Sequence, residues 1–185
     1  MASLVYTTSQ SDKDLEGIIA LQKNNLAINL TNKEIQDQGF VTVVHSFDDL
    51  KQMNNIEQHV ICKDENTVVA YLLAMTAASK TALPVLIPMF EAFDTILYLD
   101  KKISAYNYLV VGQVCVDKNY RGRGILDACY KTYQHLFKHK YDFAITEIAT
   151  RNQRSIKAHQ RIGFTEIHNY TSPDSEAWSI VLWHW

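Results

Sequence analysis

The chain has 185 residues, about the length of one domain, so a second independent core would be cramped. Hydrophobic residues make up 47% and charged residues 21% of the chain, which is close to a soluble globular protein and excludes a disordered, collagen-like or coiled-coil chain. Its 18 lysines and arginines against 20 acids leave a net charge of −2, so no overall basic field attracts nucleic-acid phosphates and nucleic acid is not an expected partner.

Apolar runs rich in β-branched and aromatic residues alternate along the chain with stretches of helical periodicity. An apolar stripe behind Ser11 predicts a helix over residues 12–26, and shorter helical patterns cover residues 32–38 and 47–53. Strands are predicted at residues 4–7, 40–45, 59–62, 68–75, 108–116, 143–148, 165–170 and 178–183. This interleaving indicates an α/β (α+β) fold, a single domain over residues 1–185 in which helices pack on a central sheet.

Two segments allow more than one interpretation. Residues 80–104 carry two prolines and a helical spacing of apolar side chains, which favours either a core-packing helix or a lid or wall over a ligand. These apolar side chains are Met89, Phe90, Phe93, Ile96 and Leu97. At the C-terminus, the alternation over residues 178–185 predicts a strand that is buried on both faces or lies at a subunit interface. The second alternative is compatible with a homodimer.

The cysteines Cys62, Cys115 and Cys129 are odd in number and widely spaced, a pattern that supports neither a disulfide framework nor a zinc site. We therefore expect no metal. The N-terminal residues lack a basic segment followed by an apolar one. The longest apolar stretch, residues 82–90, is interrupted by two prolines and is shorter than the about 20 residues of a membrane span. We expect a cytoplasmic protein without a membrane segment.

A strand, a glycine-rich turn and a helix are predicted in succession over residues 108–140. A helix that begins at such a turn presents unpaired backbone N–H groups and the positive end of its dipole, which favours a phosphate or diphosphate. Gly122 and Gly124 let the backbone approach the anion, and Arg121 and Arg123 add charged donors. The Walker motif is excluded because no Lys–Ser/Thr pair follows Gly124, and the dinucleotide-binding motif is excluded because its third glycine is missing. A tight turn with two surface arginines would have the same sequence.

Two motifs follow one another over residues 114–164. The first is a V-x-V strand end followed by [QR]-x-x-G-x-[GA], and it aligns with Val114, Cys115, Val116, Arg121, Gly122, Arg123, Gly124, Ile125 and Leu126. The second, N-x-x-[AS]-x-x-x-Y-x-x-x-G-F, aligns with Asn152, Ser155, His159, Gly163 and Phe164. Together they resemble the motifs of the GNAT superfamily of acyl-CoA-dependent N-acyltransferases. The chain departs from that family at Leu126, which replaces glycine or alanine, and at His159, which replaces tyrosine. The resemblance implies a central, mostly antiparallel mixed sheet with helices on both faces.

The same resemblance implies acetyl-CoA as the co-substrate. The residues of the first motif, together with Asn152 and Ser155, are expected to bind it, with the diphosphate on the amides of residues 122–126. In the family, Asn152 would reach the pantetheine arm, and Ser155 would lie near the pantetheine or a phosphate. The pantetheine would add to a strand edge where the strands ending at Val116 and Ile148 part.

Acetyl transfer to an amine requires the neutral amine, although a lysine-like amine with a pKa of about 10.4 is almost fully protonated at pH 7. A glutamate five residues before the asparagine acts as the general base in the ribosomal-protein acetyltransferases of the superfamily, and Glu147 has that spacing. Its alternative is a solvent-facing strand carboxylate. By resemblance His159 would protonate the leaving thiolate, and its alternative is a partly buried packing histidine. Tyr120 and Tyr170 are the nearest tyrosine substitutes.

The resulting hypothesis is an N-acetyltransferase that moves an acetyl group from acetyl-CoA to a primary amine by direct attack in a ternary complex. The acceptor, a small molecule or a peptide, would be selected by residues 24–39 and 80–104. A catalytically silent acyl-CoA-binding or sensing domain would contain the same motifs. An RNA-binding module would use the RGRG sequence and the basic residues around it, but the net charge of −2 argues against it.

Overall fold

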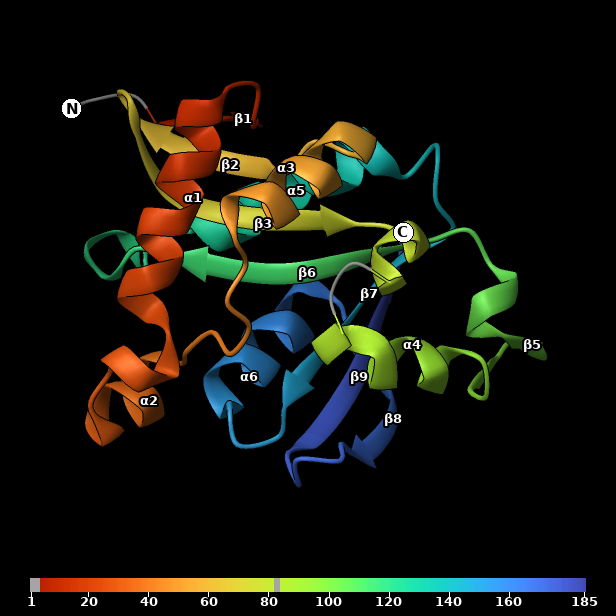
Figure 1. Ribbon diagram of the computed structural model, residues 1–185. Helices are drawn as coiled ribbons and strands as arrows, with labels where there is room; N and C mark the ends of the chain where they lie inside the picture. The colour runs from red at the N-terminus through yellow and green to blue at the C-terminus, as the bar shows by residue number, and fades with distance from the viewer. Residues whose placement is uncertain (1–3, 82–83) are drawn as a thin grey trace.

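A computed structural model describes residues 4–81 and 84–185 and contains one large sheet with helices on both faces (Figure 1). The seven strands are β1 (Leu4–Thr8), β2 (Val60–Asp64), β3 (Thr67–Met75), β6 (Tyr108–Val116), β7 (Phe143–Ala149), β8 (Thr165–Thr171) and β9 (Ala177–His184). They follow one another across the sheet in the order β1-β2-β3-β6-β7-β9-β8. Only β6 and β7 pair in parallel. The predicted mostly antiparallel mixed sheet is confirmed.

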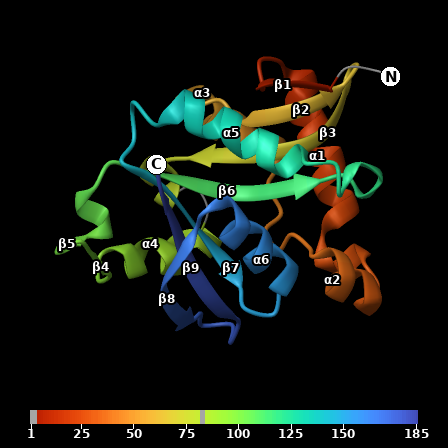
Figure 2. The ribbon, with the colours of Figure 1, turned by 180° about the vertical axis from the view of Figure 1, so that it is seen from behind.

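Helices α1 (Asp12–Asn25), α3 (Phe47–Ile56) and α4 (Ile87–Phe93) cover one face of the sheet. Helices α5 (Ile125–Phe137) and α6 (Gln153–Ile162) cover the other face (Figure 2). Each face has its own buried apolar cluster, so the sheet is a central layer between two cores. A short helix, α2 (Asn32–Gln38), and a small hairpin of β4 (Leu97–Tyr98) and β5 (Lys101–Lys102) lie at the periphery. In the part of the chain that the structure describes, no helix has both the length and the apolar character needed to cross a bilayer.

The first three helices begin at sequence-encoded caps. Ser11, Thr31 and Ser46 each accept a hydrogen bond from the backbone three residues later, where an acidic side chain bonds back to the cap. Each such reciprocal pair of bonds, a capping box, satisfies backbone N–H groups that would otherwise be unpaired at the start of the helix. The helices predicted at residues 12–26 and 32–38 are confirmed to within one residue, and the one predicted at 47–53 extends to Ile56.

The strand predicted at residues 40–45 is wrong. Its polar groups pair with helices rather than with a sheet edge, because Val41 N donates to Asn25 O at 3.0 Å and Val41 O accepts from Ala27 N at 3.1 Å. Farther along, His45 N donates to the Gln22 side chain at 2.8 Å. This segment is therefore an extended connection that packs along α1, and it makes one isolated β-bridge, between residues 26 and 41.

The two ambiguous segments are now placed. In the first segment, residues 80–104, residues 82–83 lie outside the described part. Helix α4 of this segment buries Met89, Phe90 and Phe93 in the core, so the core-packing interpretation holds for this helix. Leu97 instead leaves the helix and is 67% exposed on β4. Strand β9 lies between β7 and β8, and its residues 180–182 contribute alternately to the two apolar clusters. The expectation of a strand buried on both faces is confirmed.

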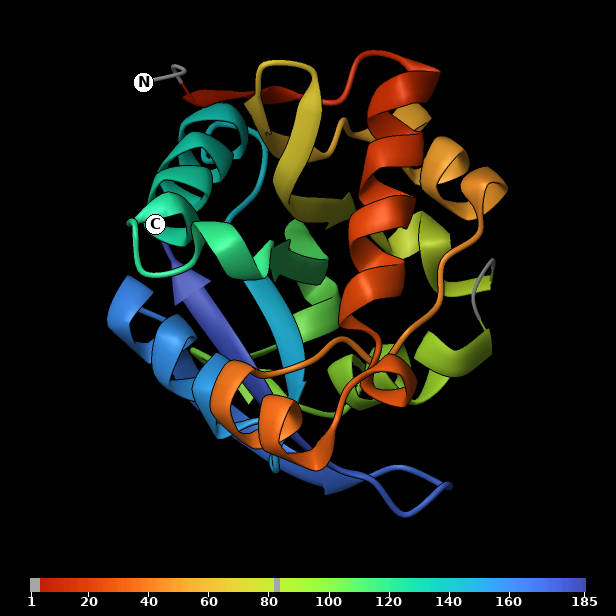
Figure 3. The ribbon, with the colours of Figure 1, turned by 90° about the vertical axis from the view of Figure 1, so that its left-hand side faces the viewer.

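Strands β6 and β7 part after a short parallel start. They pair only from Tyr108 and Phe143 to Val110 and Ile145, and beyond this point β6 continues on β3 while β7 continues on β9. The Thr146 hydroxyl, which donates to Val111 O at 2.8 Å, closes the fork. The sheet thus opens into a wedge with two unpaired strand edges. Figure 3 looks toward this open end, with α2 beside α6.

Candidate active site

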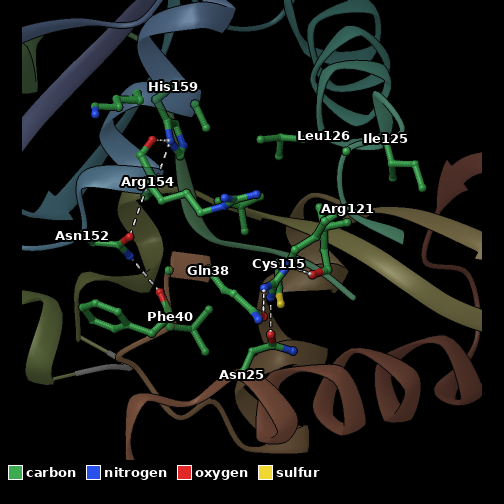
Figure 4. A pocket seen from close by; sticks show the side chains of 18 of the residues that line it. Asn25, Gln38, Phe40, Cys115, Arg121, Ile125, Leu126, Asn152, Arg154 and His159 are labelled. Atoms are coloured by element: carbon green, nitrogen blue, oxygen red, sulfur yellow. Dashed lines mark hydrogen bonds between the residues drawn. The ribbon is translucent and has the colours of Figure 1, made fainter. Parts of the chain in front are cut away.

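A cleft of about 830 Å³ occupies the open end of the wedge (Figure 4). The end of β6, the turn before α5, the start of α6, and the segment from the end of α1 through Val41 form its walls. The cleft brings together most of the predicted site residues: Val114, Cys115, Val116, Arg121, Gly122, Gly124, Ile125, Leu126, Asn152, Ser155 and His159. Arg123 and Glu147 are not among the described residues that line it. Sequence reasoning missed Phe40 and Val41, because their alternation was interpreted as a strand.

The turn before α5 has the geometry of an anion cradle. Gly122 and Gly124 adopt φ values of +74° and +72°, which side chains with a Cβ rarely take. Gly124 is the N-cap of α5 and offers no side chain to the first amides of the 13-residue helix. A Cβ added at either glycine would meet no heavy atom within 4 Å, so the space on that side of each glycine is open. The turn therefore fits a phosphate group on both charge and room.

The side chain of Arg121 is committed to the protein itself. Its Nε donates to Val116 O at 2.9 Å, Nη1 to Gln38 Oε1 at 2.6 Å and Nη2 to Asn25 Oδ1 at 2.7 Å. These three bonds connect the turn to β6, α1 and α2, so the guanidinium acts as a strut between them. The Arg123 guanidinium lies 5.2 Å from the centre of the Tyr120 ring and outside the cleft wall. The coenzyme contacts of both residues stay predictions.

The start of α6 holds the segment after α2. Asn152 caps the helix by accepting from Ser155 N at 3.2 Å, and its Nδ2 donates to Phe40 O at 3.0 Å. A Cβ at Gly39, where φ is +71°, would come within 2.9 Å of Asn152 Oδ1, so this close approach requires glycine. Arg154 adds a bond from Nη1 to Asp37 O at 2.9 Å. The asparagine amide, expected on the pantetheine, thus fastens the two walls of the cleft.

Basic side chains of α6 line the cleft beside the phosphate-sized turn. Arg154, Lys157 and Arg161 face it, and Arg161 pairs with Asp127 at 2.8 Å. The basic cluster seen in the sequence therefore adds positive charge beside the turn that fits a phosphate. RNA binding is not needed to account for it.

His159 is buried and fully hydrogen-bonded. Its Nδ1 lies 2.8 Å from Ser155 O, a carbonyl that can only accept, so this nitrogen carries the proton. Its Nε2 then accepts from the Tyr130 hydroxyl at 2.7 Å. Burial lowers the pKa of His159 to about 4, so the ring is neutral at pH 7. His159 is therefore packed and hydrogen-bonded as its alternative interpretation expects, and its role as the proton donor stays a prediction.

Glu147 lies on β7, opposite Ile180 of β9, with its side chain partly buried. It shares its strand face with Phe143 and Ile145, which belong to the apolar cluster beneath α1 and α4. The Tyr170 hydroxyl donates to Glu147 Oε2 at 2.5 Å. Burial raises the pKa of this carboxyl to about 7, with a smaller contribution from Asp174, while the Tyr170 bond opposes the rise. This environment differs from that of an ordinary solvent-facing carboxylate.

A family model described as the acetyltransferase (GNAT) family matches residues 29–164, well over half of the chain. The chain belongs to the acetyltransferase (GNAT) family. The acetyltransferase class expected from the two motifs is thereby confirmed. A search of curated proteins found no match.

Solved structures share the fold at low sequence identity. One, described as the NatC complex bound to Gag peptide and CoA, is 12% identical, with 99% of each chain covered and a TM-score of 0.67. The ribosomal-protein-S18-alanine N-acetyltransferase from Escherichia coli is 13% identical, with 98% of this chain and 94% of that chain covered and a TM-score of 0.62. Arabidopsis thaliana NAA60 in complex with acetyl-CoA is 13% identical, with 99% and 100% covered and a TM-score of 0.64. At these identities the likeness establishes the GNAT fold.

Proposed function

We propose that this GNAT domain transfers an acetyl group from acetyl-CoA to a primary amine of a small molecule or peptide, by direct attack in a ternary complex. The observation that carries the proposal is the cleft itself, in which the edge of β6, unpaired with β7 beyond Val110, leads to a helix start without a side-chain cap. Similar structures described with CoA or acetyl-CoA support this choice of co-substrate.

The chain's own residues suit the parts of this coenzyme. The open amides of residues 122–126 would hold the diphosphate, with Arg154 and Lys157 supplying nearby positive charge. The edge of β6 near Val114 would pair with the pantetheine amides, in the manner of an added strand. When bound, acetyl-CoA supplies the activated acetyl thioester. Among the described residues, no group of His, Cys, Asp or Glu side chains is placed to hold a metal ion.

Glu147 would take the proton from the acceptor amine. Its pKa of about 7 leaves roughly half of the carboxyl groups ionised at neutral pH, and it makes the carboxylate a stronger base than an exposed glutamate. Deprotonating a lysine-like amine at pH 7 costs about 4–5 kcal/mol, which a positioned base reduces. Attack by the amine would break the thioester C–S bond, and CoA would leave as a thiolate that takes a proton from water. The ring proton of neutral His159 is instead bonded to Ser155 O.

Thiol release from acetyl-CoA over a panel of primary amines, combined with the substitution Glu147→Gln, tests the proposal. We expect Glu147→Gln to lower turnover at pH 7 by about 100-fold or more without changing the Kd for acetyl-CoA. Glu57→Gln is a matched control, because Glu57 also accepts from a tyrosine, Tyr141, at 2.9 Å but lies at the end of α3 rather than on β7. Equal loss of turnover and affinity in Glu147→Gln, or loss of neither, would contradict the base assignment.

A silent acyl-CoA-binding domain is the second candidate, and the neutral, fully bonded His159 is the observation that favours it. Such a domain would bind acetyl-CoA by calorimetry but release no thiol with any amine.

We infer a cytoplasmic location from the three buried free thiols, which suit a reducing compartment. The C-terminal tryptophans Trp183 and Trp185 pack against Tyr130 and Tyr133 of α5 in the same chain, so they do not require a partner copy. The homodimer stays a prediction that light scattering can test.

A further inference from the structure

The pair formed by Glu147 and Tyr170 spans two strand boundaries. Glu147 on β7 is opposite Ile180 on the middle strand β9, and Tyr170 on β8 is opposite Trp178 on the same strand. The phenol therefore reaches diagonally across β9 to the carboxylate, and the oxygens are 2.5 Å apart. This bond between Tyr170 and Glu147 requires the whole β7-β9-β8 arrangement, and it orients the carboxyl group.

The bond also makes the two oxygens of the Glu147 carboxyl group different, because it involves only one of them. Tyr170 donates its only hydroxyl proton to Oε2, and no other hydrogen bond or ion pair reaches the Glu147 carboxyl group within the described chain. Oε2 therefore shares one of its lone pairs with the phenol, whereas Oε1 keeps both of its lone pairs to accept a proton. From this geometry we propose that Tyr170 is a positioning residue for acetyl transfer, which orients the Glu147 carboxylate and reserves Oε1 for the proton of the acceptor amine. The proposal rests on the proposed function of Glu147 as the base.

The electrostatic surroundings give Tyr170 a second effect on the same carboxyl group. The titratable groups that act on Glu147 are Tyr170 from β8 and Asp174 from the turn between β8 and β9, while β9 presents the apolar Ile180. The cation Arg151, in the turn after β7, is paired with Glu176 at 2.9 Å. With burial and Asp174 both raising the pKa of Glu147, the phenol is the group that favours the ionised, proton-accepting form.

The substitution Tyr170→Phe removes the hydroxyl and keeps the ring that packs against the core. Losing a hydrogen bond to a charged group is expected to move the rising limb of the pH profile of kcat/KM upward by about one pH unit. Activity at pH 7 then falls about fivefold and returns to within about twofold of the unsubstituted chain at pH 9. Tyr141→Phe is the matched control, because it removes the bond from a tyrosine to the Glu57 carboxylate and should leave the profile unchanged.

A titration of the Glu147 carboxyl carbon by NMR, assigned with Glu147→Gln, separates this inference from the proposed function. The expected result is an upward shift of the carboxyl pKa in Tyr170→Phe together with the shift of the rate profile. A loss of activity that is equal at all pH values, or a carboxyl titration that does not move, overturns the positioning role. A carboxyl titration that moves while the rate profile stays in place overturns Glu147 as the base, and the role of Tyr170 in catalysis with it. If no amine is acetylated, the proposed function fails, whereas the NMR titration still decides whether Tyr170 controls Glu147.

Discussion

The substitution Gly124→Ala separates the folding of the turn before α5 from its ability to bind a diphosphate. The φ of +72° at Gly124 costs a residue with a Cβ roughly 1 kcal/mol. The added Cβ meets no heavy atom within 4 Å, so no clash adds to this cost. We therefore expect the free energy of unfolding to fall by about 1 kcal/mol, which lowers Tm by about 2–4 °C in a chain of this size.

Binding should suffer more than folding. Gly124 lines the cleft at the start of α5, so the methyl group would be added beside the amides on which the diphosphate is proposed to lie. The loss of one hydrogen bond to a charged group is worth about 1.5–3 kcal/mol, which corresponds to a rise in Kd on the order of 10- to 100-fold. Isothermal titration calorimetry with acetyl-CoA measures Kd, and urea denaturation measures stability.

The matched control is Gly163→Ala. Gly163 also has a positive φ, +120°, and its added Cβ would lie 3.1 Å from the Trp183 Nε1, but it does not line the cleft. This variant should lose at least as much stability as Gly124→Ala and keep its Kd. An unchanged Kd in a folded Gly124→Ala protein, or an equal rise in both variants, would refute the placement of the diphosphate on this turn.

Three further predictions concern side chains that are buried or hydrogen-bonded within the protein. Arg121→Ala removes the three bonds of the strut and should lower the free energy of unfolding by about 2 kcal/mol in urea; an unchanged midpoint would contradict the strut. Tyr130→Phe leaves His159 Nε2 unpaired and buried and should cost about 1–3 kcal/mol, measured in the same way. Burial lowers the pKa of His45, His59 and His159 to about 4, below the ordinary 6.5, so the folded state favours the neutral rings. Their stabilisation is complete above pH 6.5 and is lost as pH falls toward 4, at up to about 1.4 kcal/mol per pH unit for each ring, and a constant urea midpoint from pH 7.5 to 5 would contradict it.

The helices and most strands follow from local rules that the sequence displays. The caps at Ser11 and Ser46 mark helix starts because their side chains satisfy the first amides, whatever the rest of the fold does. The segment at residues 40–45 shows the limit of such rules, because an alternating pattern states which side chains are buried but not what the backbone pairs with. Here the end of α1 supplied the partners that a neighbouring strand would have supplied.

For the candidate site, the sequence predicted the location of residues better than their roles. Most of the site residues that the two motifs predicted line the cleft, because each motif is a local strand–turn–helix unit whose glycines and caps determine its shape. The wall formed by the end of α1, α2 and the segment after it lies outside both motifs. The roles of individual side chains were not readable from spacing. His159 and Arg121 have the residue types for proton donation and phosphate binding, yet each has its hydrogen bonds taken up by residues far away in the chain.

By itself the amino-acid sequence determined the α/β class, the strand–turn–helix that forms the anion cradle, and the membership of the GNAT family that its motifs indicate. Only the tertiary structure decided which titratable groups keep a usable proton. Burial and long-range partners set the pKa of His159 near 4 and that of Glu147 near 7, and these contacts exist only after the strands have assembled. The physical reason is that ionisation depends on the solvent and the charges within a few ångströms, which the order of residues along the chain does not specify.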